Sequence, residues 1–113
     1  MHLCGDVQRH LPTIARELNV KSFDTGYPVD FARLRGEVGD DVEIQGGVRV
    51  TDLVSGTPGE VRAGARAILE SGIMRGGRFI MKEANNMPPR TPVANIAALY
   101  EAVREHGRYG ARA

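Results

Sequence analysis

Polar side chains that could bind or react recur where four predicted strands of this sequence end. Each group follows a short apolar stretch and precedes a helix signal. In a parallel barrel, the carboxyl ends of all strands form one rim, and catalytic residues lie on that rim. The sequence therefore predicts half of an enzyme's active face. The residues concerned are His2, Cys4, Asp6, Asp24, Gln45, Glu83, Asn85 and Asn86.

His2 and Cys4 form the most specific pair in this set. On a strand, residues i and i+2 point to the same face, so an imidazole and a thiolate would lie side by side. Zinc prefers such nitrogen and sulfur ligands, and a catalytic zinc normally has three protein ligands. The pair would supply two of them. Alternatively, Cys4 is a small buried apolar residue and His2 belongs to a ragged chain end.

Asp24 and Gln45 each end a predicted strand. Asp24 is a candidate catalytic residue that could bind substrate or steer a base, or it could cap the following loop. Gln45 is a candidate substrate-binding residue. The Gly46-Gly47 pair after it indicates either a close approach to the backbone or a simple turn.

Glu83 is a candidate third metal ligand or a general acid–base, and it could instead pair with Lys82. Asn85 and Asn86 are candidate substrate contacts. Because they precede Pro88-Pro89, they could equally form a tight turn.

Hydrophobic spacing and capping signals divide the chain into four strand–helix units. Thr57 and Glu60 form a capping box, with Pro58 at the first helical position. This alternation predicts an α/β fold of four consecutive βα units with parallel strands and crossover helices. The predicted strands are 1–4, 20–24, 42–45 and 78–81, the predicted helices are 11–18, 30–38, 57–69 and 91–103, and 49–53 is a single helical turn. The tail from Gly107 is expected to fray.

The size and charge of the chain limit the classes of function that we expect for it. Its 113 residues correspond to one domain, and a formal charge of +1 without a basic stripe argues against a nucleic-acid partner. No apolar run reaches the roughly 20 residues that a membrane crossing needs. A single cysteine fits a reducing compartment, so a cytoplasmic location is expected.

Four parallel strands leave two open edges, and both faces of a parallel sheet are normally covered. The chain is therefore expected to form a homodimer, to dock with a complementary amino-terminal half barrel, or to be a fragment of a longer protein.

The sequence resembles the carboxyl-terminal half of the uroporphyrinogen decarboxylase superfamily, which includes the cobalamin-dependent methyltransferases. The resemblance runs from His2 to about Tyr109, so residues 1–109 would form the half barrel and 110–113 a tail. It implies the last four units of a (β/α)8 TIM barrel. The landmarks are His2-Leu3-Cys4-Gly5-Asp6, Ser22-Phe23-Asp24, Val42-Glu43-Ile44-Gln45-Gly46-Gly47, Thr57-Pro58-Gly59-Glu60-Val61 and Pro89-Arg90-Thr91-Pro92-Val93-Ala94-Asn95.

The resemblance implies a function for the rim. In the methyltransferases, a His-x-Cys pair and a later cysteine bind zinc, which activates a thiol that accepts a methyl group from a corrinoid. His2 and Cys4 match the pair, but the later cysteine falls on Asn85, so Glu83 is the candidate substitute. Asp24 and Gln45 would then shape the substrate pocket.

The decarboxylase branch uses no metal and has a histidine at the position of Asn85. The absence of that histidine from this sequence argues against true uroporphyrinogen decarboxylation. Decarboxylation of a tetrapyrrole or another acid by Asp24 remains an alternative, as does a non-catalytic half barrel that completes a partner.

Overall fold

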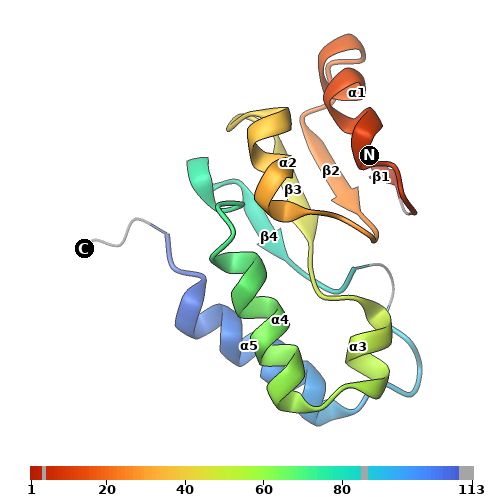
Figure 1. The fold of residues 1–113 in the computed structure, drawn as a ribbon, viewed down its shortest axis with the longest axis vertical. Helices are drawn as coiled ribbons and strands as arrows, with labels where there is room; N and C mark the ends of the chain where they lie inside the picture. Colours follow the sequence, from red (N-terminus) through yellow and green to blue (C-terminus); the bar gives the residue numbers. More distant parts are fainter. Residues whose placement is uncertain (4, 85–86, 110–113) are drawn as a thin grey trace.

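The computed structural model describes residues 1–3, 5–84 and 87–109, and these residues contain one four-stranded parallel sheet (Figure 1). The strand order, β1-β2-β3-β4, follows the sequence. This arrangement confirms the prediction of consecutive parallel βα units. The strands are β1 (His2–Leu3), β2 (Ser22–Thr25), β3 (Glu43–Gly46) and β4 (Phe79–Met81).

The helices connect these strands as crossovers, and local capping fixes where two of them begin. The Asp30 side chain accepts a hydrogen bond from the backbone of Arg33, and Thr57 and Glu60 form the predicted capping box. The helical segments are η1 (Gln8–His10), α1 (Leu11–Glu17), α2 (Phe31–Val38), α3 (Val50–Ser55), α4 (Pro58–Leu69), η2 (Arg75–Gly77) and α5 (Val93–His106).

Successive strand residues alternate between two faces of the sheet, and only one face carries the core. Phe23, Ile44 and Phe79 are buried against Leu34 of α2 and Leu69 of α4. A second cluster joins α3, α4 and α5, which lie together at one end of the molecule (Figure 1). The shortest dimension, 17 Å, is that of one sheet and one helix layer, so within residues 1–3, 5–84 and 87–109 no second layer covers the opposite face of the sheet.

Arg35 holds the amino-terminal ends of the last two strands together. The residue is only 2% exposed, and its guanidinium donates hydrogen bonds to the backbone carbonyls of Gly39, Val42, Ile73 and Arg78. Burial lowers the pKa of Arg35, but its four carbonyl partners satisfy the charge. The side chain therefore ties the end of α2 to the loops that enter β3 and β4.

Tyr109 lies against the open edge of β4. Its hydroxyl accepts a hydrogen bond from the backbone N–H of Phe79 at 2.9 Å and donates one to the carbonyl of the same residue at 2.6 Å. The expectation that the chain frays from Gly107 is therefore wrong for residues 107–109, because this contact ties them to the sheet edge. The predicted tail, 110–113, lies outside the described residues.

None of the helices in the described part of the chain combines the length and apolarity that a bilayer crossing needs.

Candidate functional site

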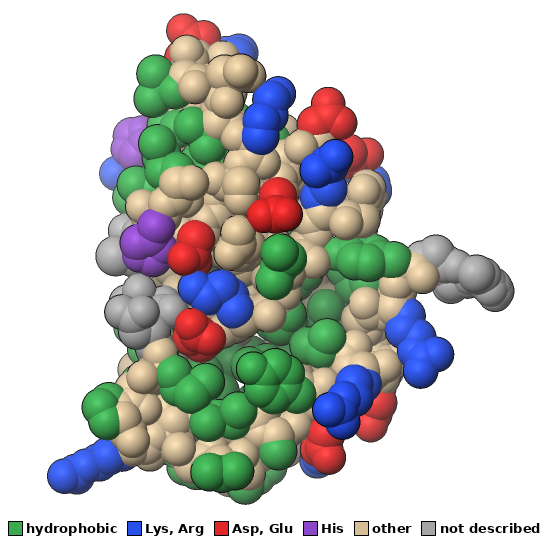
Figure 2. Space-filling model, turned by 180° about the vertical axis from the view of Figure 1, so that it is seen from behind, with side chains coloured by type: hydrophobic (Ala, Val, Ile, Leu, Met, Phe, Trp, Pro, Cys, Tyr) green, Lys and Arg blue, Asp and Glu red, His purple; other side chains and the backbone are tan. Residues whose placement is uncertain are grey.

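The uncovered face of the sheet carries a cluster of polar side chains at the carboxyl ends of the strands. The parallel register places His2 beside Asp24 and Asp24 beside Gln45. Lys82, just after β4, reaches Asp24 from the other side. Figure 2, which views this face, shows a histidine, acidic groups and a basic group next to one another. We call His2, Asp24, Gln45 and Lys82 the polar row.

Asp24 lies at the centre of the polar row. Its Oδ1 accepts a hydrogen bond from Lys82 Nζ at 2.9 Å, and its Oδ2 lies 3.1 Å from His2 Nδ1. The side chains of Asp24 and Lys82 are 27% and 22% exposed, so water screens their attraction only in part. Residues from β1, β2 and the segment after β4 thus meet at one carboxylate.

The environment of Asp24 favours its ionised form. Burial raises the pKa of this carboxyl group, but the hydrogen bonds and positive charges of Lys82 and His2 together outweigh burial. The net result is a pKa below the usual range for aspartate. Asp24 is therefore a carboxylate acceptor near neutral pH.

The His2 ring is oriented by Asp24. Because Nδ1 faces the carboxylate, Nε2 is the nitrogen left to contact a metal ion or a substrate. A carboxylate on the second ring nitrogen is a common feature of metal-binding histidines. In this respect His2 fits the predicted metal site.

The remaining predicted metal ligands do not complete a site among residues 1–3, 5–84 and 87–109, since no group of three metal-binding side chains occurs there. Cys4 lies outside the described residues. Glu83 is 23% exposed, and its Oε1 lies 3.7 Å from the ammonium group of Lys82. The fit to zinc therefore rests on His2 and its carboxylate partner.

Gln45 lies in the polar row, but its amide nitrogen is directed to a second polar group. It donates hydrogen bonds to Ser22 Oγ and to Glu43 Oε1, and Ser22 Oγ also donates to Glu43. The structure thus brings Gln45 next to Asp24, as predicted, with its amide group held by these neighbours. The other predicted substrate contacts, Asn85 and Asn86, lie outside the described residues.

The two glycines after Gln45 allow a close approach, but the approaching groups belong to the protein itself. A Cβ on Gly46 would clash with the side chains of Thr25 and Phe31. A Cβ on Gly47 would clash with the backbone carbonyl of Lys82. Gly46 thus makes room for Thr25 and Phe31, whereas Gly47 lets the segment after β4 lie close to the end of β3, which brings Lys82 within reach of Asp24.

Lys82 is the member of the polar row that the sequence predicted only as an ion-pair partner of Glu83. The sequence did contain a pattern that predicts the position of Lys82. Lys82 follows Ile80 by two positions, so both side chains point to the face of the sheet opposite to the buried Phe79. The predicted ion pair with Glu83 is present at 3.7 Å, but the shorter ion pair, at 2.9 Å, is with Asp24, which lies 58 residues away in the chain. Only the order of the strands in the sheet reveals that pairing.

A parallel sheet with its helices on one face, and with polar groups at the carboxyl ends of its strands, defines half of a (β/α)8 barrel. The sequence model of "Uroporphyrinogen decarboxylase (URO-D)" matches residues 1–106. The chain therefore belongs to the URO-D family.

Comparison with known proteins supports the fold. A solved structure described as a "methyltransferase from Methanosarcina mazei" superimposes with a TM-score of 0.79 at 23% sequence identity. The match covers 95% of this chain and 31% of that protein, so the chain spans about a third of the length of its structural relative. No curated protein matches the sequence.

Proposed function

We propose that the chain contributes part of the active face of a zinc-dependent methyltransferase of the URO-D family, one that uses a corrinoid as methyl donor. The observation that carries the proposal is the 3.1 Å contact between His2 Nδ1 and Asp24 Oδ2. This contact fixes the orientation of the ring and directs Nε2 away from Asp24.

The donor set suits a zinc ion that binds a thiol. His2 would supply a nitrogen, and Cys4, two residues later in the sequence, would supply a sulfur. A bound zinc ion acts as a Lewis acid and lowers the pKa of a coordinated thiol. Glu83 is the candidate for a third ligand or for moving a proton.

The other members of the polar row would support this site. Asp24 orients the His2 imidazole, and Lys82 keeps Asp24 ionised by donating to its second oxygen. Gln45 borders the same carboxylate and would shape the adjoining pocket. The similarity to a methyltransferase structure is compatible with this assignment at the level of the fold.

Metal binding by the 113-residue chain tests the proposal. We expect near-stoichiometric zinc in the purified protein by elemental mass spectrometry. With cobalt in place of zinc, we expect a near-ultraviolet thiolate-to-metal charge-transfer band. Cys4→Ser would remove that band, and Asp24→Asn would weaken zinc affinity by about 10- to 100-fold, as expected for loss of a carboxylate behind a ligating histidine.

His106→Gln is the matched control, because His106 lies on α5, pairs with its neighbour Glu105 and takes no part in the polar row. This variant should bind zinc as the wild type does. Wild-type protein that takes up no zinc, or cobalt spectra unchanged by Cys4→Ser, would exclude the methyltransferase proposal.

The lowered pKa of Asp24 also favours a second candidate function, metal-independent decarboxylation of a tetrapyrrole or another acid. An ionised Asp24 could accept a hydrogen bond from a substrate N–H group, while Lys82 neutralises part of the charge of a substrate carboxylate. Decarboxylation by the chain, completed by the rest of a barrel, would then be insensitive to chelators and lost in Asp24→Asn. Loss of activity on chelation would contradict this alternative.

A further inference from the structure

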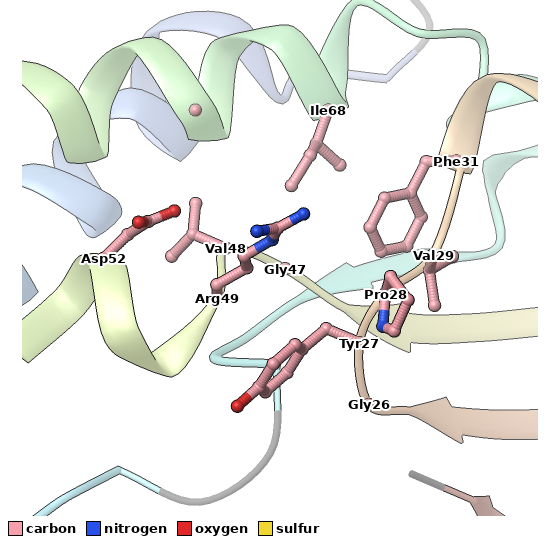
Figure 3. Close-up of a pocket in the computed structure, with 11 residues that line it drawn as sticks. Gly26, Tyr27, Pro28, Val29, Phe31, Gly47, Val48, Arg49, Asp52 and Ile68 are labelled. Atoms are coloured by element: carbon pink, nitrogen blue, oxygen red, sulfur yellow. The ribbon is translucent and has the colours of Figure 1, made fainter. Parts of the chain in front are cut away.

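A hollow separate from the polar row lies between the loop after β2, the start of α3, and α4 (Figure 3). Its volume is about 200 Å³. Phe31, which lines it, packs against the helix-covered side of β3, whereas Asp24 and Lys82 lie on the opposite face of the sheet. The hollow is therefore distinct from the candidate active site.

Apolar side chains form the inner walls of the hollow. Phe31 and Val48 are 7% and 5% exposed, and Ile68 and Pro28 lie beside them. A cavity of about 150 Å³ with such walls can hold benzene. The space therefore suits an apolar body about the size of a single ring.

Arg49 supplies the positive charge of the hollow. It lies between the end of β3 and the start of α3, and Figure 3 shows its side chain reaching toward the space between Ile68 and Phe31. Within the described residues it forms no ion pair and no side-chain hydrogen bond. A guanidinium in this position has donors available for an anionic group.

Asp52 also lines the hollow and limits the charge of any anion bound there. Neither its carboxylate nor the Tyr27 hydroxyl has a side-chain partner in the part of the chain that the structure describes. One positive and one negative side chain give the lining no net charge, so a second negative charge on a ligand would be repelled by Asp52. A monocarboxylate suits this arrangement better than a phosphate ester.

Gly64 of α4 keeps the space open. Glycine in the interior of a helix is less favourable than alanine, so its presence needs a reason. A Cβ at this position would meet only Val48 Cγ1, at 3.4 Å, which is not a severe clash. Since Gly64 lines the hollow, an added methyl group would occupy part of the volume that a ligand needs.

From these observations we infer that the hollow binds a small monocarboxylic acid whose apolar body is about one ring in size. The carboxylate would accept hydrogen bonds from Arg49, and the body would lie against Phe31, Val48 and Ile68. This inference is independent of zinc and of the polar row.

Benzoate tests whether the hollow binds a monocarboxylic acid. It is titrated into the 113-residue chain, and binding is followed by calorimetry and by amide chemical shifts. For a ligand of this size we expect a dissociation constant on the order of 1 mM or tighter. Arg49→Gln should weaken binding at least tenfold. Neutral benzamide should bind the wild type more weakly than benzoate, and inorganic phosphate should not bind at the hollow.

Gly64→Ala separates loss of binding from loss of structure. This variant should unfold at a higher urea concentration than the wild type and yet bind benzoate at least several-fold more weakly. Arg33→Gln, an exposed change on α2 away from the hollow, should leave binding unchanged. Absence of saturable benzoate binding by the wild type, or equal binding by Arg49→Gln, would overturn the inference.

Cys4→Ser keeps this experiment independent of the proposed function. That variant should lose the predicted metal site and still bind benzoate with the affinity of the wild type. If Cys4→Ser also abolished benzoate binding, the hollow would not be a separate site.

Discussion

Asp24 is the residue through which three separate segments of the chain meet. Its partial burial opposes ionisation, and Lys82 and His2 reverse that effect, so that the pKa of Asp24 in the folded protein lies below its ordinary value. A group with a lowered folded-state pKa stabilises the fold above its unfolded-state pKa. That stabilisation disappears as the pH falls through the folded-state pKa.

Asp24→Asn should therefore destabilise the protein in a pH-dependent way. At pH 7 we expect a loss of about 1 kcal/mol in the free energy of unfolding, because the partly screened ionic hydrogen bond from Lys82 and the contact with His2 are removed. The difference between the wild type and the variant should shrink below about pH 4, where an unfolded aspartate is protonated, and disappear only below the lower folded-state pKa of Asp24. Urea unfolding at neutral and at acidic pH measures the free energies of unfolding of the wild type and the variant, and so their difference at each pH. The control is Asp6→Asn, whose weak contact with Arg9 is fully at the surface. A wild-type–variant difference that stays constant with pH would contradict the pKa argument.

The sequence predicted the secondary structure elements well because their signals are local. The capping box at Thr57, the cap at Asp30 and the apolar spacing of α4 all depend on residues within four positions of one another. The common position of Asp24 and Gln45 followed from the rule that parallel strands end at one edge. The Lys82–Asp24 pair and the Tyr109–Phe79 contact were missed because their partners come together only in the folded chain.

The apolar pattern of α2 does not predict that Arg35 is buried. Phe31, Leu34, Arg35 and Val38 fall at the i, i+3, i+4 and i+7 positions of a core-facing stripe in α2. A charged residue in such a stripe is expected to reach the surface. Here the guanidinium instead donates to four backbone carbonyls, two of which, those of Ile73 and Arg78, lie 38 and 43 residues away, where no local pattern connects them to α2.

Arg35→Met should be one of the most destabilising single changes in the protein. It would remove the donor of the Gly39, Val42 and Ile73 carbonyls, whereas the Arg78 carbonyl keeps its hydrogen bond from the backbone N–H of Ile44. The expected loss is about 3 kcal/mol or more in the free energy of unfolding. Chemical denaturation monitored by circular dichroism measures the loss. Arg33→Met, two residues away on the exposed face of α2, should change stability by less than about 0.5 kcal/mol. Similar stabilities for the two variants would show that the carbonyl contacts contribute little.

At the scale of the whole molecule, the half barrel leaves large apolar side chains exposed. Ile80 on the open face of the sheet is 49% exposed, and Val93 and Tyr100 on α5 are 78% and 58% exposed. Figure 2 shows hydrophobic side chains gathered next to the polar groups of the open face. The structural relative is about three times as long, so the missing cover has the size of the rest of a barrel. We propose that a second half barrel covers this surface, and that a second copy of the chain does so when no complementary half is present.

The purified chain should accordingly self-associate through this surface. At tens of micromolar, we expect multi-angle light scattering to give a mass above that of one chain, because burial of Val93, Tyr100 and Ile80 stabilises association by roughly 25 cal/mol per Å² of apolar surface removed from water. The double variant Val93→Lys/Tyr100→Lys should shift the protein toward the monomer without lowering its unfolding midpoint, since both side chains are exposed in the single chain. Leu18→Lys is the matched control, because Leu18 is equally exposed, at 66%, but lies at the end of α1. A wild-type chain that remains monomeric across the concentration range, or a double variant that associates as strongly as the wild type, would show that this surface is not what holds two half barrels together.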